Sequence, residues 1–327
     1  MKNANEFARQ YVKAAQALGI KPEAYDVHTR RIMPPRQGET SYLMVCNVYK
    51  ENRPRAPPKP AAQGQKPDCG LCKDINRATT KGDNAMFDGD YKPFAVLPNP
   101  FPFDFGHVML VDTQHSSDYY RVPTKEKLET IVRFEAETGA RGWRNVYGTN
   151  SSVPGHEHTH AMQVQFPAEF IATQQIANGI EELVSFPGQH IVFSGENRAT
   201  LAHEFITNLQ NEQHPNEEMQ KIGIFPYVSL FAGSKIYLAP VRVPQYPQPG
   251  NIGAGEIFGV YATPVKKKLL DRDVTDEKWN SMSAEERANT ILQIQSSTTH
   301  EEIVGSIRYV LFQQGKDAFD IRKLVKA

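Results

Sequence analysis

The sequence predicts an α+β fold, and the order of its segments carries that prediction. β-rich segments recur in both halves of the chain, for example at 41–49, 106–112 and 227–239. One long helical pattern, at 123–139, lies among the extended segments of the first half. Strands interleaved with one long helix indicate an α+β layout.

The first half of the chain begins with a helical pattern. Residues 1–17 predict an amphipathic helix, because Phe7, Tyr11 and Leu18 fall on one stripe. The proline-rich stretch 53–60 cannot continue a helix or a central strand, so an extended connector is expected there. Further elements are expected as strands at 41–49, 91–100, 106–112, 143–147 and 157–166, with the long helix at 123–139.

The second half repeats the pattern more weakly. Two closing helices are expected, because Ser283 with Glu286 and Thr299 with Glu302 have the spacing of capping boxes. The other expected elements are helices at 169–177 and 198–211, a hairpin of 227–231 with 235–239, a loop at 243–255 and a strand at 256–260.

Composition and charge exclude several classes of protein. The 327 residues are 39% hydrophobic and 23% charged, which is typical of a globular protein with a core. Basic and acidic residues number 37 each, so no net field favours nucleic acid or an anionic membrane as partner. No apolar run approaches the roughly 20 residues of a membrane span, and 1–17 lacks a signal-peptide core. Only three cysteines are present, which favours a reducing, cytoplasmic location.

The sharpest chemical feature is the segment His156-Glu157-His158-Thr159-His160. Residues two apart on a strand point to the same face, so the three imidazoles are expected to line one surface. The pattern fits a solvated edge strand, a set of three metal ligands, or a nucleophile flanked by helpers. The nucleophile is the preferred interpretation, because three adjacent strand positions suit a tetrahedral metal poorly.

A histidine nucleophile points to chemistry at phosphorus. Imidazole is partly neutral near neutral pH, and the phosphoramidate that it forms is itself a good leaving group. The preceding turn, 150–155, has small side chains and can bring backbone N–H groups and the hydroxyls of Ser151 and Ser152 close to phosphate oxygens.

The second chemical feature is the pair Cys69-x-x-Cys72. In a reducing compartment this spacing indicates half of a zinc site or a redox pair. A redox pair should precede a helix in a βαβ unit, and 73–82 has only a weak helical pattern. A closed zinc site needs two more ligands, for which His115 and His156 are the candidates.

These segments, taken together, resemble the histidine-triad superfamily, and most closely its large two-lobed nucleotidyltransferases. That group includes galactose-1-phosphate uridylyltransferases, dinucleoside tetraphosphate phosphorylases and GDP-hexose phosphorylases, the last of which look nearest. The likeness is strong over 69–166 and weaker over 227–242 and 255–264. The motifs that carry it are Cys69-x-x-Cys72, Leu97-Pro98-Asn99-Pro100-Phe101-Pro102, Gly106-His107-Val108-Met109-Leu110-Val111, His115 and Ser152-x-x-x-His156-x-His158-x-His160.

The resemblance implies a histidine-triad-like antiparallel sheet with helices, in two related lobes of which the second is degenerate. The N-terminal lobe, 1–167, would hold the zinc site and the catalytic motif, and 168–327 would form the second lobe. His156 would complete a structural Zn²⁺ site with the two cysteines of the motif and His115. Relatives are often dimers, so a homodimer is one expected assembly.

The resemblance also assigns roles at the substrate. His158 matches the nucleophile, Ser152 a phosphate-contacting serine, and Asn145 an asparagine upstream of it. His160 departs from the transferases, which usually carry glutamine there, and agrees with the hydrolase branches. Histidine can act as an acid toward the leaving group, whereas glutamine can only hold the intermediate.

Two further positions depart from the family, and cations must be sought elsewhere. Glu157 and Thr159 stand where relatives commonly carry apolar residues, so the reverse face of this strand is expected to be less buried than in them. Cations are needed to neutralise nonbridging phosphate oxygens. The preferred candidates are Arg53, Arg55 and Arg242.

The resemblance therefore implies double displacement on a nucleotide or nucleotide-sugar substrate. His158 would attack the α-phosphorus of a nucleoside diphosphate sugar or a dinucleoside polyphosphate, and inorganic phosphate would then attack the nucleotidyl-histidine. Three alternatives remain open on the sequence: water as acceptor, a nucleotide-binding protein without activity, and a metal-dependent hydrolase that uses the three histidines as ligands.

Overall fold

The computed structural model describes most of the chain, and all statements below concern the residues that it describes. These are 4–20, 27–32, 42–47, 69–81, 87, 89–100, 102–103, 105–115, 122–145, 156–242, 254–262, 275, 278, 281–313, 317 and 319–325. None of the described helices is both long and apolar enough to cross a bilayer.

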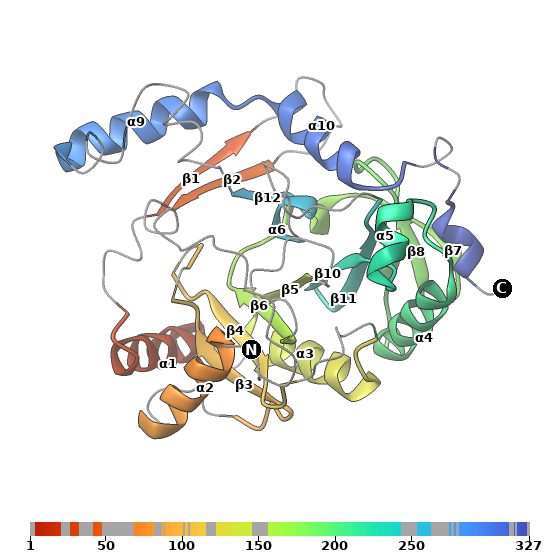
Figure 1. The fold of residues 1–327 in the computed structure, drawn as a ribbon, viewed down its shortest axis with the longest axis horizontal. Coiled ribbons are helices and arrows are strands. Elements are labelled where there is room, and N and C mark those ends of the chain that lie inside the picture. The colour runs from red at the N-terminus through yellow and green to blue at the C-terminus, as the bar shows by residue number, and fades with distance from the viewer. Residues whose placement is uncertain are drawn as a thin grey trace.

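The described elements confirm an α+β layout (Figure 1). The first half contains α1 (Ala4–Ala17), β1 (Val27–Ile32), β2 (Tyr42–Asn47), α2 (Gly70–Lys81), β3 (Phe94–Pro98), β4 (Val108–Asp112), α3 (Lys125–Thr138), β5 (Arg141–Asn145) and β6 (His158–Met162). The second half contains η4 (Pro167–Phe170), β7 (Thr173–Ala177), β8 (Ile180–Leu183), β9 (Ile191–Phe193), α4 (Arg198–Asn211), α5 (Glu217–Ile222), β10 (Tyr227–Ala232), β11 (Lys235–Pro240), α6 (Ala254–Ile257), β12 (Val260–Ala262), α9 (Ala284–Ser297), α10 (His300–Val310) and η5 (Ile321–Leu324).

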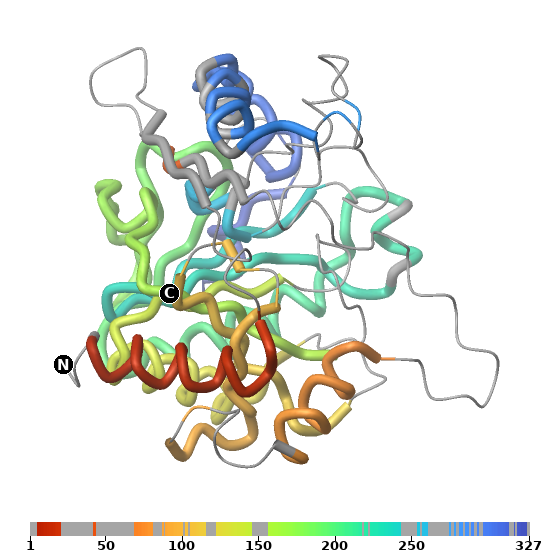
Figure 2. Tube along the Cα trace, turned by 90° about the vertical axis from the view of Figure 1, so that its left-hand side faces the viewer, coloured from red at the N-terminus to blue at the C-terminus, as the bar shows by residue number. Residues whose placement is uncertain are grey.

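The described strands form two sheets. The large sheet has nine strands in the order β3-β4-β6-β5-β10-β11-β9-β8-β7, and every neighbouring pair in it is antiparallel. The small sheet, β1-β2-β12, pairs β12 in parallel with β2. Helices α9 and α10 lie at one end of the molecule and α1 and α2 at the other, with the large sheet between them (Figures 1 and 2).

The large sheet is built from two copies of one topology. In the first copy the strands β3, β4, β5 and β6 are ordered β3-β4-β6-β5, with α3 between β4 and β5. In the second copy β8, β9, β10 and β11 are ordered β8-β9-β11-β10, with α4 between β9 and β10. The copies join where β5 pairs with β10, with Trp143 opposite Leu230. Two related lobes are therefore present, and the boundary expected at 167/168 remains a prediction.

Each face of the large sheet carries its own core. One face packs against α1, α3 and α4, through residues such as Tyr11, Phe134 and Phe205. The other face packs around Trp143, Phe166 and residues of α6 and α10. Because side chains alternate along a strand, each strand contributes to both cores. The site described below lies on the Trp143 face.

Several expected elements are confirmed with local causes that the sequence contains. Helix α3 begins at its N-cap Thr124, whose hydroxyl accepts from the Lys127 N–H, and ends at Gly139 with φ 71°. The β10–β11 hairpin turns through Gly233 and Ser234, both with positive φ, as a two-residue turn of this type requires. The capping box of Thr299 with Glu302 starts α10.

The helix expected at 169–177 is wrong. The segment forms the short η4 and then strand β7, which pairs with β8 across Asn178-Gly179. Gly179 has φ 71°, and the Asn-Gly pair with flanking β-branched residues is the hairpin signal that the helical interpretation passed over. The strand expected at 256–260 is also wrong over most of its length, because α6 occupies 254–257 and β12 begins at Val260.

A buried histidine marks the second lobe. His190 directly precedes β9, as His107 directly precedes β4 in the first lobe. It is 2% exposed, and its ring lies among Phe186 and Phe258. Nδ1 donates to the Gly188 carbonyl at 3.2 Å, and Nε2 has no hydrogen-bond partner among the described residues. Burial in these apolar surroundings lowers the pKa of His190 to about 4.

This histidine predicts a loss of stability in acid. Between its unfolded pKa of 6.5 and its folded pKa of about 4, only the unfolded chain binds the proton. Stability therefore falls as pH drops through this window, by roughly 3 kcal/mol from this group. Replacement His190→Leu removes the titration. Denaturant unfolding across the window should show a smaller pH slope in this variant than in the wild type, and equal slopes would contradict the prediction.

Candidate active site and metal cluster

Four predicted metal ligands come together where three elements end. Cys69 directly precedes α2, and Cys72 lies in its first turn. His115 follows β4, and His156 precedes β6. One ligand atom from each side chain lies within 4.8 Å of every other. Two of the four ligands therefore depend on the helix and two on adjacent strands of the sheet.

The separations fit a single tetrahedral ion. The Cys69 sulfur lies 3.1 Å from His156 Nδ1, and the Cys72 sulfur lies 3.3 Å from His115 Nδ1. The two Nδ1 atoms are 3.3 Å apart. A metal about 2.0–2.3 Å from each donor atom requires ligand separations of this size. The donor set of two sulfurs and two imidazoles could therefore hold a metal ion.

Contacts around the cluster favour the protonation states in which its side chains bind a metal. Nε2 of His156 lies 2.7 Å from the Asp112 carbonyl, to which it donates, so the Nδ1 lone pair points to the cluster. Burial opposes charge on Cys69, but its close contact with His156 lowers the pKa of the Cys69 thiol below its ordinary value. The first turn of α2 adds the positive end of the helix dipole beside both sulfurs. Thiolates, the form that binds metal, are thus favoured.

His158 is held in the tautomer that a nucleophile needs. It begins β6 and is 3% exposed. Its Nδ1 lies 2.9 Å from the His156 carbonyl, an acceptor, so the ring proton sits on Nδ1. The lone pair of the neutral ring is therefore on Nε2. The same residue, His156, supplies a side chain to the metal cluster and a carbonyl to His158.

A chain of contacts also sets the tautomer of His160. The backbone N–H of Phe103 donates to His107 Nδ1 at 2.9 Å, which places the His107 proton on Nε2. That atom lies 3.0 Å from His160 Nδ1, and the Asn99 amide nitrogen lies 3.3 Å from the same Nδ1. His160 Nδ1 is thus an acceptor, and its ring proton sits on Nε2. His160 therefore presents an N–H donor.

Aromatic stacking fixes these rings in place. Trp143 stacks on His160 with centroids 5.4 Å apart, and Phe103 stacks on His107 at 5.2 Å. The rings of His158 and His160 meet edge to face at 5.1 Å. Of the three histidines expected to share one sheet face, His158 and His160 lie two residues apart on β6 and do so, whereas His156 lies before the strand. Asn99, Phe103 and Trp143 were given no role in the sequence interpretation, although Asn99 lies in one of its motifs.

The predicted substrate contacts are only partly described. Asn145 is buried, and its side-chain oxygen accepts from the Ala254 N–H at 2.8 Å, which ties β5 to α6. Arg242 donates to the Tyr309 carbonyl at 2.7 Å and lies 3.9 Å from Asp317. These contacts secure the two side chains to the second-lobe side of the fold. The remaining candidates, Arg53, Arg55, Ser151 and Ser152, lie outside the described residues.

The reverse face of β6 is covered, contrary to expectation. Glu157 is 3% exposed and Thr159 is fully buried, and both point toward the α3 side of the sheet. Glu157 is compensated by ion pairs with Lys127 and Arg144. Burial of a carboxylate at this position was not foreseen, because the cations that neutralise it come from other elements.

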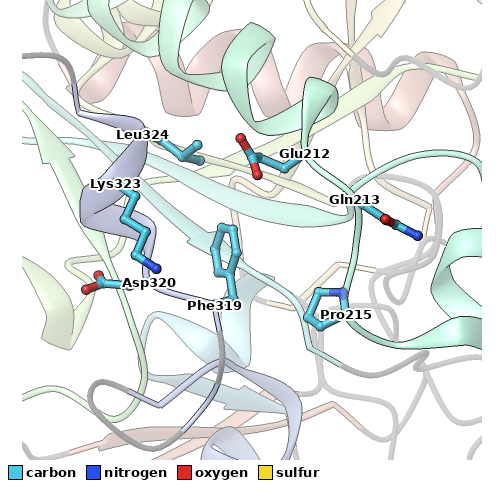
Figure 3. A pocket seen from close by; sticks show the side chains of 7 residues that line it. All are labelled: Glu212, Gln213, Pro215, Phe319, Asp320, Lys323 and Leu324. Carbon is cyan, nitrogen blue, oxygen red and sulfur yellow. The ribbon is translucent and has the colours of Figure 1, made fainter.

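A separate surface cavity of about 190 Å³ lies in the second lobe, where the chain after α4 meets η5 (Figure 3). None of the site histidines lines it. Its walls are formed by Glu212, Gln213, Pro215, Phe319, Asp320, Lys323 and Leu324. The cavity is therefore distinct from the histidine site.

Comparison with solved structures shows where this fold occurs. The crystal structure of yeast Ap4A phosphorylase Apa2 matches with a TM-score of 0.57 and 14% identity, over 97% of each chain. The structure of the same enzyme in complex with Ap4A matches with a TM-score of 0.58 and 14% identity, over 95% of this chain and 98% of that one. No protein-family model and no curated protein sequence matches this chain. The resemblance expected from the motifs is thus confirmed for the fold.

The cluster predicts metal binding that depends on the cysteines. Elemental analysis of the purified protein should find about one transition-metal ion per chain, and Cys72→Ser should lose most of it because a closed site needs all four ligands. Cys46→Ser, at the third cysteine of the sequence, serves as the matched control. His158→Ala should keep its metal, and loss of metal from that variant would instead favour the three histidines as ligands.

Proposed function

We propose that this protein is a phosphorylase-type nucleotidyltransferase that works through a covalent nucleotidyl-His158 intermediate. The substrate class is a nucleoside diphosphate sugar or a dinucleoside polyphosphate, with inorganic phosphate as acceptor. The observation that carries the proposal is the hydrogen bond from His158 Nδ1 to the His156 carbonyl at 2.9 Å, which leaves the nucleophilic lone pair on Nε2.

The first step forms a bond between His158 Nε2 and the α-phosphorus. The bond from that phosphorus to the leaving oxygen breaks, and the leaving group departs with its electron pair. In the second step a phosphate oxygen attacks the same phosphorus and the bond to Nε2 breaks, which releases a nucleoside diphosphate and restores His158. The carbonyl of His156 stabilises the positive charge that the ring carries while it is nucleotidylated.

His160 supports this chemistry as a hydrogen-bond donor. Its Nε2–H can donate to a phosphate or leaving-group oxygen, as a glutamine amide would, because His107 and Asn99 direct donors at its Nδ1. This geometry reconciles the histidine at 160 with a transferase. The hydrolase alternative, with water as acceptor, rests on the same residue, since a histidine can also protonate the leaving group.

Zn²⁺ is the metal that best fits the cluster. Two thiolates and two imidazoles form the donor set of a structural zinc site, and four protein ligands leave no open position for catalysis. Within the proposal, Cys69, Cys72, His115 and His156 hold the ion, and their role is to fix the start of β6. The nucleotide substrate is further supported by the shared fold, since the neighbouring enzyme was solved in complexes with Ap4A and with AMP.

Product analysis tests the proposed reaction directly. A panel of nucleoside diphosphate sugars and dinucleoside polyphosphates is incubated with and without inorganic phosphate, and products are separated by anion-exchange chromatography. Phosphate-dependent release of a nucleoside diphosphate is the expected result. Release of a nucleoside monophosphate regardless of phosphate would establish the hydrolase instead. The His158→Ala variant should lose about 10³-fold or more in turnover, because the covalent route is then closed.

The donor role of His160 gives a second prediction. His160→Gln keeps an N–H donor and should retain turnover within about tenfold, whereas His160→Leu should lose about 10²-fold or more. The measurement is kcat on the substrate identified by the panel, with and without phosphate. An equal loss in both variants would contradict a donor role and would indicate that the imidazole moves a proton.

A further inference from the structure

A chain of buried charges runs behind the nucleophile strand. The Lys127 ammonium group lies 2.5 Å from an Asp112 carboxylate oxygen and 2.6 Å from Glu157 Oε2. The other oxygen of Glu157 lies 3.2 Å from the Arg144 guanidinium group, which donates to the Tyr227 hydroxyl at 2.8 Å. The chain therefore connects α3 with β4, β6, β5 and β10.

These charged groups are largely buried, so each one needs its ion-pair partners to offset the loss of hydration. The side chain of Arg144 is fully buried, those of Asp112 and Glu157 are 4% exposed, and that of Lys127 is 18% exposed. Two cations face two carboxylates, so the cluster is neutral as a whole. Burial opposes charge on Lys127, but the carboxylates of Glu157 and Asp112 raise its pKa above the ordinary value. Lys127 therefore remains charged.

The chain meets the site at its backbone. Glu157 stands between His156 and His158, so any shift of Glu157 moves both histidines. The Asp112 carbonyl accepts from the His156 ring at 2.7 Å, and the Asp112 N–H donates to the Glu157 carbonyl at 3.0 Å. Lys127 thus binds the side chains of Asp112 and Glu157. The backbone of Asp112 contacts the His156 ring, and the backbone of Glu157 joins His156 to His158.

If an apolar contact replaced the ion pairs of Lys127, β6 would be freer to slide along β4. One ammonium group shared between two carboxylates is satisfied in one relative position of β4 and β6, since a buried charge without its partner is costly.

We propose that Lys127 is a positioning residue that fixes β4 against the start of β6 and so couples metal retention by His156 to the placement of His158. The inference deepens the proposed function and rests on it for its kinetic and metal-release readouts, whereas the histidine spectrum tests it independently. Mutation of residues that support metal ligands commonly lowers metal affinity or activity by about 10- to 100-fold.

The test compares three variants of the full-length protein. Lys127→Met removes the charge and keeps the length of the side chain, and Lys127→Arg keeps the charge. Lys125→Met is the matched control, because Lys125 lies in the same helical turn, is about half exposed and pairs only loosely with Glu129 at 3.6 Å. Metal release to a chromogenic chelator, kcat, KM and the ¹⁵N spectrum of labelled histidines are measured on each.

The expected result for Lys127→Met is a metal release about tenfold faster and a kcat about tenfold lower, with KM changed by less than about threefold. Its His158 nitrogen signals should also depart from the Nδ1–H pattern of the wild type. Lys127→Arg and Lys125→Met should resemble the wild type in all four readouts. If Lys127→Met fails to fold, Lys127→Gln, which keeps an N–H donor without the charge, takes its place.

Failure of the inference and failure of the proposed function have different signatures. If Lys127→Met matches Lys125→Met in metal release and in the histidine spectrum, the positioning role is overturned whatever the activity. If the wild type turns over none of the substrates tested, the proposed function fails, while faster metal release and a changed His158 signal in Lys127→Met still support the positioning role.

Discussion

The site depends on a single short backbone segment, His156 to His160, and on what its neighbours require of it. The His156 ring is held by the metal cluster and by the Asp112 carbonyl, while its own carbonyl orients His158. Antiparallel pairing of β6 between β4 and β5 then sets the direction of every second side chain. A displacement of this segment would move the cluster residue His156 and the candidate nucleophile His158 together.

Duplication of the strand order explains the size of the large sheet, and the two copies differ in the surroundings of their histidines. Both lobes place a histidine directly before their second strand, His107 in the first and His190 in the second. In the first lobe that ring donates to His160, whereas in the second it lies against phenylalanine rings without a partner for Nε2 among the described residues. Strand β11, the counterpart of β6, carries Tyr237 and no histidine. The second lobe thus has the strand order of the first, but its strand β11 has no counterpart of His158 and His160.

One error in the sequence interpretation came from a local turn signal that was passed over, and another came from contacts between distant elements. The segment 169–177 has helix-compatible residues, yet it lies at the edge of the sheet because Asn178-Gly179 reverses the chain onto β8. The buried charge of Glu157 could not be foreseen, since its partners Lys127 and Arg144 lie 30 and 13 residues away in the sequence. Periodicity gives the face of a residue but not the elements that cover that face.

The sequence by itself determined the α+β class, the shared face of His158 and His160, and the pairing of Cys69 with Cys72, because spacing within a strand or a Cys-x-x-Cys turn is fixed locally. It also predicts His115 and His156 as the other two ligands, but their approach to the cysteines depends on the pairing of β4 with β6. Tertiary structure decided the roles that depend on distant partners. The proton positions on His158 and His160 follow from a carbonyl, from His107 and from Asn99, and no local pattern encodes those contacts. The joining of the lobes at β5 and β10 likewise became visible only when strands far apart in the sequence paired.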